Sequence, residues 1–159
     1  MRIEIDLSKQ QLSLMDDSGK SLKVYPVSTA LRGPGEISGS QCTPRGLHVV
    51  RAKIGSGQPL NSVFVGRRPT GEIYSPELGQ EAPERDWILS RILWLSGTEP
   101  GFNRLGNCDS MRRYIYIHGT PDELFRQRPE SHGCIRMRNA DVAELFELVP
   151  PYIAVDIHS

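Results

Sequence analysis

Arg113-Tyr114-Ile115-Tyr116-Ile117-His118 is a run in which aromatic and aliphatic side chains alternate. β-Branched and aromatic residues suit a pleated, half-buried surface, and a period of two sends neighbouring side chains to opposite faces. The run therefore predicts a β-strand that carries Tyr114 and Tyr116 on one face and ends at His118. A strand end is a rigid platform for aiming a ring, so His118 is a candidate functional residue.

Patterns of the same kind recur along the chain and predict strands at 2–7, 10–15, 46–54 and 152–157. Helical periodicity is clear only in 140–149, where apolar residues recur at i, i+3, i+4 and i+7. Asn139 is placed to cap this helix, and Pro150-Pro151 ends it. The apolar run 86–95 fits a helix and a buried strand equally well. The chain is therefore expected to be rich in strands.

Length and composition bound the kind of protein. The 159 residues suit one domain with a sizeable core, and no repeat or linker divides them, so residues 1–159 are predicted to form a single domain. The 38% hydrophobic and 24% charged content favours neither disorder nor a membrane span. Nineteen basic residues balance nineteen acidic ones, which gives no reason to expect nucleic acid or an anionic membrane as a partner.

Cysteine usage and the N-terminus bear on location. Cys42, Cys108 and Cys134 are an odd, widely spaced set, which fits free thiols in a reducing compartment better than a disulfide framework. The first residues alternate as in a strand, and no basic segment followed by an apolar one marks a secretory signal. The expected location is cytoplasmic, or the periplasm or cell envelope if a leader has been trimmed away.

The segment Ser131-His132-Gly133-Cys134-Ile135-Arg136 carries the chemistry. A thiol attacks a carbonyl as its thiolate, and an unperturbed cysteine has a pKa of about 8.5. An imidazole such as that of His118 can take the proton, and Arg136 could lower the thiol pKa or grip a substrate carboxylate. Gly133 leaves room for substrate to reach the N–H groups of Gly133 and Cys134, which predicts an oxyanion hole.

The pairing of His118-Gly119-Thr120 with Ser131–Arg136 resembles the catalytic signature of the L,D-transpeptidase (YkuD-type) family. Two further segments agree: Ile5–Gln10 with Leu12 is similar to that family's opening strand, and Thr43-Pro44-Arg45-Gly46 to its Thr-Pro-x-Gly turn. Asn139 and Asp141 are similar to its usual continuation. The resemblance spans residue 3 to about residue 157.

The resemblance implies a mostly β fold, an L,D-transpeptidase-type β-sandwich with one or two short helices. It implies that Cys134 is the nucleophile that forms a thioester and that His118 is the general base and acid. His132 and Gly133 complete the implied catalytic set, and Ser131, Arg136 and Gly119 are the implied substrate-binding residues. No metal or organic cofactor is implied.

The implied substrate is a peptidoglycan stem tetrapeptide, cut at the amide between its third residue (meso-diaminopimelate or another) and the terminal D-Ala. Transfer to water gives L,D-carboxypeptidase activity, expected here on muropeptides recovered during wall turnover; transfer to an amine gives cross-links. The family thiol also forms adducts with carbapenem β-lactams, so acylation of Cys134 is expected. The segment 72–112 exceeds a minimal core and could form a lid or a specificity wall.

Two alternative functions, a zinc-binding site and a non-catalytic binding module, remain open. His118, His132, Cys134 and Cys108 could bind zinc, although no Cys-x-x-Cys or His-Glu-x-x-His spacing supports such a site. A non-catalytic module that binds the cell wall would also have a substrate groove. Metal analysis of the purified protein tests for the zinc site. Alkylation of Cys134 tests for the binding module, because an enzyme would lose turnover whereas a module would still bind.

Overall fold

A computed structural model describes residues 1–159 as a sheet of ten strands with two short helices. The strands are β1 (Arg2–Asp6), β2 (Gln11–Met15), β3 (Ser21–Pro26), β4 (Gly46–Ile54), β5 (Ser62–Val65), β6 (Arg68–Ile73), β7 (Ile88–Gly97), β8 (Tyr116–Thr120), β9 (Ile135–Arg138) and β10 (Ala154–His158). The helices are α1 (Pro76–Glu81) and α2 (Asn139–Leu148). The prediction of a mostly β fold with one or two short helices is confirmed.

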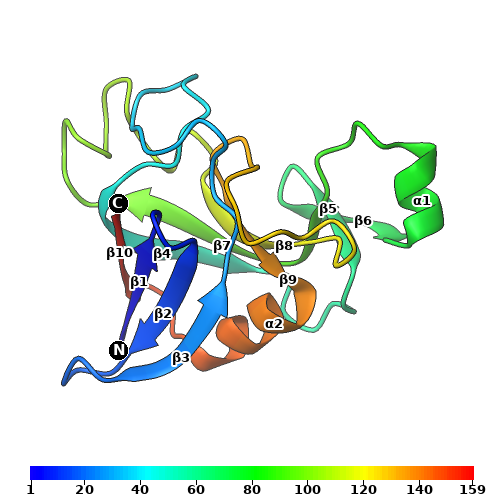
Figure 1. The fold of residues 1–159 in the computed structure, drawn as a ribbon, viewed down its shortest axis with the longest axis horizontal. Helices are drawn as coiled ribbons and strands as arrows, with labels where there is room; N and C mark the ends of the chain where they lie inside the picture. The colour runs from blue at the N-terminus through cyan, green and yellow to red at the C-terminus, as the bar shows by residue number, and fades with distance from the viewer.

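Strand β7 is the centre of the sheet. The main path runs β3-β2-β1-β10-β4-β7-β5-β6, and β8 pairs with β7 on one side and with β9 on the other. The two chain ends lie on the same side of the molecule, at opposite ends of the parallel neighbours β1 and β10, whereas α1 and the β5–β6 hairpin lie on the far side (Figure 1).

The sheet curls back on itself through the segment that follows β3. Ser28 and Arg136 exchange backbone hydrogen bonds of 2.9 and 2.8 Å, and Thr29 accepts one of 2.9 Å from the N–H of Ser131. These bridges join the N-terminal strands to β9, so the two arms of the sheet enclose a common interior.

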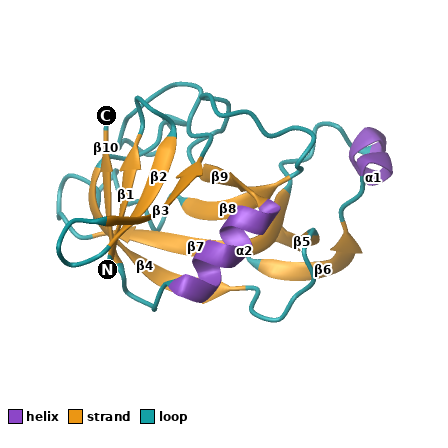
Figure 2. Ribbon diagram, turned by 60° about the horizontal axis from the view of Figure 1, so that its bottom comes forward, coloured by secondary structure: helices purple, strands orange, loops and turns teal.

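Alternation along β8 and β9 separates two faces. Ile117, Ile135 and Met137 belong to a core of 21 buried residues, which α2 completes with Leu145 and other residues. Tyr116 points to the opposite face and joins a smaller apolar cluster. Helix α2 packs against β7, β8 and β9 (Figure 2). The side chains of Tyr116, His118 and Thr120 on β8 therefore point away from the main core.

The ambiguous run 86–95 is a strand in the structure. Residues Leu89–Leu93 of β7 are buried without interruption, because the strand has neighbours along both edges and packed side chains on both faces. From Trp87 onward the run is apolar except for buried Ser90 and Arg91 and shows no alternation, so periodicity alone does not separate a central strand from a buried helix.

The predicted cap of α2 is wrong by one residue. Asn139 is the first residue of the helix, and Arg138 precedes it without a side-chain capping bond. The side chain of Asn139 is instead buried, and its amide donates to the carbonyl of Thr120 (2.9 Å) and to Oδ1 of Asn61 (3.0 Å). The residue therefore ties the helix to the end of β8 instead of capping the helix.

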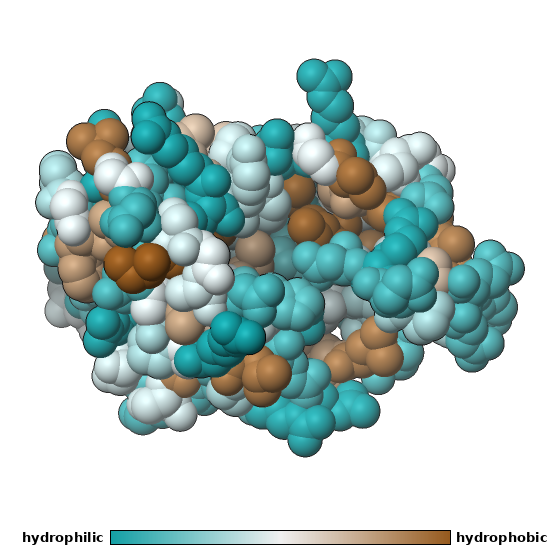
Figure 3. Space-filling model, turned by 90° about the horizontal axis from the view of Figure 1, so that it is seen from above, coloured by the Kyte–Doolittle hydropathy of each residue, from teal (hydrophilic) through white to brown (hydrophobic).

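Neither helix is long and apolar enough to cross a bilayer. The face drawn in Figure 3 is largely hydrophilic, with apolar side chains in separate small groups. Such scattered exposure is ordinary for a folded protein.

Candidate active site

Strand register brings the predicted nucleophile and base to one face. His118 on β8 lies opposite Arg136 on the parallel strand β9. Cys134 precedes β9 by one residue, and its sulfur contacts the backbone N–H of Tyr116, two residues before His118. Side chains two residues apart on a strand share a face. Cys134 and His118 are therefore diagonal neighbours on the face that points away from the main core.

The Cys134 sulfur lies in a small backbone cradle. It accepts a hydrogen bond from the N–H of Tyr116 (3.4 Å) and donates one to the carbonyl of Tyr114 (3.3 Å). Although part of the residue is exposed, burial disfavours the anion and raises the pKa of the Cys134 thiol to about 12, against the smaller opposing effects of the Tyr116 N–H and Arg136. With its pKa raised in this way the thiol is neutral at pH 7, so its attack on a carbonyl requires a base that takes the proton.

The ring of His118 is held in one tautomer. Its Nδ1 lies 2.6 Å from the carbonyl oxygen of Gly119, and a carbonyl only accepts, so Nδ1 carries the proton. The neutral ring then has its lone pair on Nε2. Burial lowers the pKa of His118 below its ordinary value, and the negative charge of Asp86 opposes this only in part. His118 is thus an uncharged base at neutral pH.

Ser131 braces the loop that carries the nucleophile. Its buried hydroxyl donates to the carbonyl of Cys134 (2.6 Å) and accepts from the N–H of Gly133 (3.2 Å). The hydroxyl of Thr43 donates to the carbonyl of Gly133 (2.9 Å) and so attaches the loop to residues 31–45. Ser131 therefore has a structural role in the loop, and its predicted substrate contact stays a prediction.

The two N–H groups of the predicted oxyanion hole differ in their hydrogen bonding. The N–H of Gly133 is already used by Ser131, whereas the N–H of Cys134 makes no hydrogen bond within the protein. Gly133 matters for its conformation: its φ is +133°, and an added Cβ would lie 3.2 Å from the carbonyl oxygen of Cys42. In this conformation only the N–H of Cys134 is available to an oxyanion.

Gly119, predicted to bind substrate, lies in a position that leaves no room for a side chain. A Cβ at this position would lie 2.4 Å from Oδ1 of Asn139 and 2.6 Å from the carbonyl oxygen of Leu89. The residue is buried between β7 and β9, and its carbonyl fixes the ring of His118. Any side chain here would displace the base.

A cleft of about 400 Å³ opens beside the His118 end of the site. Arg136 and the exposed His132 line it, together with Glu84, Arg85, Asp86, Arg126, Arg128, Glu130 and others. Nη2 of Arg136 lies 3.6 Å from Oδ1 of Asp86, a loose pair that leaves the guanidinium free to exchange partners. Neither Cys134 nor His118 lines the cleft, but the charges of its lining residues Asp86 and Arg136 act on the pKa of both groups.

Asp86 and Arg113 are charged residues near the site that no sequence motif marks. Arg113 donates to the carbonyl of Cys42 (2.7 Å) and to those of Gly35 and Glu36. It holds the loop 31–45 in place beside Gly133. No local signal reveals such a contact, because the partners lie more than 70 residues apart.

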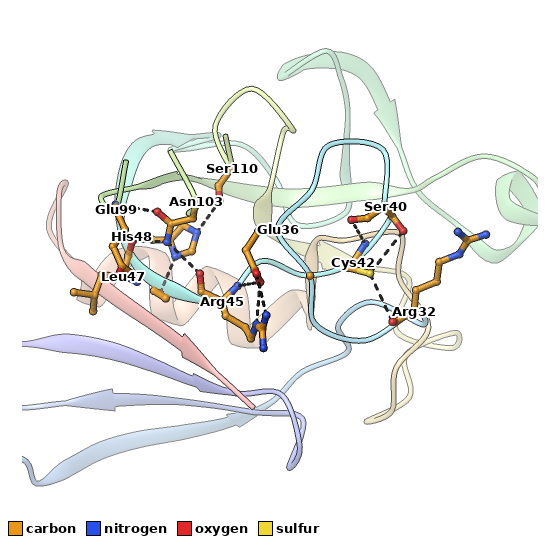
Figure 4. A network of polar contacts seen from close by, with 12 residues as sticks. Arg32, Glu36, Ser40, Cys42, Arg45, Leu47, His48, Glu99, Asn103 and Ser110 are labelled. Carbon is orange, nitrogen blue, oxygen red and sulfur yellow. Dashed lines mark hydrogen bonds and ion pairs between the residues drawn. The ribbon is translucent and has the colours of Figure 1, made fainter. Parts of the chain in front are cut away.

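The loop 31–45 and its neighbours form an ordered polar network (Figure 4). Glu36 receives two hydrogen bonds of 2.9 Å from the guanidinium of Arg45, and the sulfur of Cys42 faces the carbonyls of Arg32 and Ser40. Buried His48 lies between the carbonyl of Gly46 and the hydroxyl of Ser110. The loop 31–45 is therefore held by several hydrogen bonds beside the nucleophile loop.

Removing the Ser131 hydroxyl should loosen the nucleophile loop. In Ser131→Ala the buried N–H of Gly133 loses its partner, and the carbonyl of Cys134 loses its bond to the hydroxyl, so we expect a loss of about 1–3 kcal/mol in the free energy of unfolding. Urea denaturation measures it, with Ser56→Ala, on an exposed loop, as the matched control within about 0.5 kcal/mol of wild type. Equal stabilities for the two variants would contradict the bracing role.

Residues 1–159 contain no group of three or more His, Cys, Asp or Glu side chains arranged to hold a metal ion. The ligand set proposed for zinc is thus not assembled in this structure.

Comparison with known proteins agrees with this geometry. A family model described as the L,D-transpeptidase catalytic domain matches residues 1–157. Among solved structures, an L,D-transpeptidase from Xylanimonas cellulosilytica has a TM-score of 0.55 at 21% identity, with 98% of this chain and 59% of that one covered. L,D-transpeptidase 3 from Mycobacterium tuberculosis, bound to a faropenem-derived adduct, has a TM-score of 0.58 at 16% identity, with coverage of 99% and 59%.

A third structure, an L,D-transpeptidase in complex with imipenem, has a TM-score of 0.56 at 17% identity, with coverage of 98% and 57%. The chain thus spans less than two thirds of the length of each of these structures, and at such identities they share its fold. No curated protein sequence matches the chain.

Proposed function

The chain belongs to the L,D-transpeptidase catalytic domain family, and from this premise we propose that it cleaves the amide before the terminal D-Ala of peptidoglycan stem tetrapeptides through a thioester on Cys134. The observation that carries the proposal is the placement of a neutral thiol and a neutral imidazole, with its lone pair on Nε2, on one face of adjacent strands.

The acylation step follows from these atoms. Nε2 of His118 takes the thiol proton as Sγ of Cys134 bonds to the scissile carbonyl carbon. The free N–H of Cys134 faces the developing oxyanion. The intermediate collapses when His118 passes its proton to the leaving amine. D-Ala departs, and the acyl group remains as a thioester on Cys134.

We propose water as the acceptor. His118 deprotonates a water molecule, hydroxide adds to the thioester, and the sulfur leaves and regains a proton, so that tetrapeptide and water give tripeptide and D-Ala. The cleft volume of about 400 Å³ suits one small ligand, and water needs no site for a second stem. The names of the structural relatives favour the alternative, transfer to an amine with formation of a cross-link.

Soluble muropeptides in the cytoplasm are the proposed substrates. All three cysteines, Cys42, Cys108 and Cys134, are free thiols, which supports a reducing compartment. Arg136 and the cleft beside it, which four arginines and three carboxylates line, are the proposed site for the D-Ala carboxylate, with His132 also in the lining.

One experiment tests donor and acceptor together. Wild type and Cys134→Ala are incubated with disaccharide tripeptide, tetrapeptide and pentapeptide, and the products are identified by mass spectrometry. We expect wild type to convert tetrapeptide into tripeptide and D-Ala, and the variant to convert nothing. Cross-linked dimers without free tripeptide would overturn the choice of water.

Carbapenem exposure should add the mass of one drug molecule to the protein. The relatives bound to imipenem or to a faropenem-derived adduct support this expectation, because a strained lactam carbonyl acylates an accessible thiol. Intact-mass spectrometry detects the adduct, and Cys134→Ala is the control that should gain nothing. A wild-type mass unchanged after long exposure would count against an activated sulfur.

The pH dependence of kcat/KM should reflect a thiol of Cys134 and an imidazole of His118 that are both neutral near pH 7. Because burial lowers the pKa of His118 below its ordinary 6.5, log kcat/KM should fall only below about pH 6.5, as His118 gains a proton. Since the pKa of Cys134 is raised to about 12, no thiolate limb should appear up to about pH 9. A sharp maximum near neutrality would contradict this assignment.

The same pKa shifts predict how stability varies with pH. Unfolding restores the ordinary pKa of His118, so stability present above 6.5 is lost as pH falls through the lowered pKa of the folded state. For Cys134 the folded pKa is raised, so stability present below 9.0 is lost as pH rises toward 12. Urea midpoints across pH should therefore form a plateau from about 6.5 to 9.

A further inference from the structure

Arg67 stands at the tip of the β5–β6 hairpin in a strained conformation. The hairpin turns through Gly66 and Arg67, whose φ angles of +56° and +65° follow the two-residue I′ pattern. Asn and Gly are the usual residues of this turn, and for a long side chain the left-handed conformation is unfavourable. Strain of this kind is retained where the side chain it presents is needed.

The guanidinium of Arg67 rests on an aromatic platform. The guanidinium carbon Cζ lies 4.9 Å from the ring centre of Trp94 and 4.8 Å from that of Tyr114. Nη1 donates to the hydroxyl of Tyr116 (3.1 Å). None of the seven ion pairs of the structure includes Arg67, whereas Arg45, Arg85 and Arg136 each face a carboxylate. Its remaining N–H groups are available to an anion.

This platform adjoins the nucleophile. Tyr116 contacts both groups, with its N–H on the Cys134 sulfur and its hydroxyl on Arg67, and the carbonyl of Tyr114 receives the thiol hydrogen. His118 and Arg136 lie on the other side, since β8 runs from Tyr116 toward Thr120 and Arg136 pairs with His118. Cys134 is therefore flanked by two cationic positions.

The proposed chemistry gives the two sides different occupants. His118 must protonate the leaving amine, so the departing D-Ala lies on the side of His118 and Arg136. The residue that keeps the acyl carbon then extends in the opposite direction, toward Tyr116 and Arg67. A cation there suits a third stem residue that bears a carboxylate on its side chain.

We propose that Arg67, on its platform of Trp94, Tyr114 and Tyr116, binds the side-chain carboxylate of the third stem residue and so selects diaminopimelate stems over lysine stems. This inference rests on the proposed function and adds its substrate class. Diaminopimelate and lysine differ in this position by that one carboxylate. A planar guanidinium can bind it through two parallel hydrogen bonds.

The test compares three tetrapeptide stems that differ only at this group: diaminopimelate, diaminopimelate with its side-chain carboxylate amidated, and lysine. Release of D-Ala is measured for wild type, Arg67→Gln, Arg67→Lys and the matched control Arg68→Gln, whose side chain is exposed on the same hairpin. Thermal melts verify that each variant is folded.

Wild type and Arg68→Gln should prefer the diaminopimelate stem by roughly 10- to 100-fold in kcat/KM over both other stems. Arg67→Gln should lose that preference by slowing on diaminopimelate alone, and Arg67→Lys should keep part of it. Equal preference in wild type and Arg67→Gln, or an equal slowing of Arg67→Gln on all stems, would overturn the role of Arg67. Failure of wild type to release D-Ala from any stem would instead overturn the proposed function.

Discussion

Replacing Cys134 with alanine should lower kcat for release of D-Ala by roughly 10⁴-fold or more, because removal of a covalent nucleophile removes the thioester route entirely. The substitution deletes one sulfur from a partly exposed site, so the fold should persist. Product release under saturating tetrapeptide, followed by mass spectrometry, measures the loss.

Cys42→Ala is the matched control, since Cys42 is also a free and partly exposed thiol beside the same loops. It should retain the wild-type rate. Persistent turnover in Cys134→Ala, or an equal loss in both variants, would show that the chemistry does not pass through this sulfur.

Replacing His118 with glutamine should lower kcat/KM by roughly 10³- to 10⁴-fold. The loss is expected to be large because the thiol pKa of about 12 leaves almost no spontaneous thiolate at neutral pH, so the reaction depends on a base. The residual rate should rise steadily with pH as hydroxide replaces the imidazole, whereas wild type stays level from about pH 6.5 to 9.

His158→Gln serves as the control because this histidine is exposed on β10 and far from the site in the sheet. Its rate and pH profile should match those of wild type. A glutamine variant at 118 with the wild-type profile would assign the base to another group.

Much of the fold is predictable where the pattern is local, although the strand expected at 113–118 begins only at Tyr116 and continues to Thr120, because residues 111–114 form a turn. The strand at 46–54 and the helix in 140–149 follow from alternation and from i, i+3, i+4 spacing, and the structure places β4 and α2 there. The run 86–95 could not be decided because a strand buried on both faces has no alternation. Asn139 was misassigned because its partners Asn61 and Thr120 come from distant segments.

For the site, Cys134 and His118 are predictable from sequence motifs, but their protonation states are not. The pKa of a thiol depends on how much protein surrounds it, which is a property of the folded chain. The same reason applies to Ser131 and Gly133, whose hydrogen-bonding groups turn toward each other. Arg67 carries no motif, and only the hairpin turn brings it to Tyr116.

The backbone hydrogen bonds that join Ser28 and Thr29 to β9 and the loop before it also constrain when the enzyme can fold during its synthesis. They join positions more than 100 residues apart, and contacts of such long separation form late in folding. A chain still emerging from the ribosome therefore holds its thiol on an unassembled loop until the last strands are released. Reactivity at position 134 would then report completed folding of the whole polypeptide.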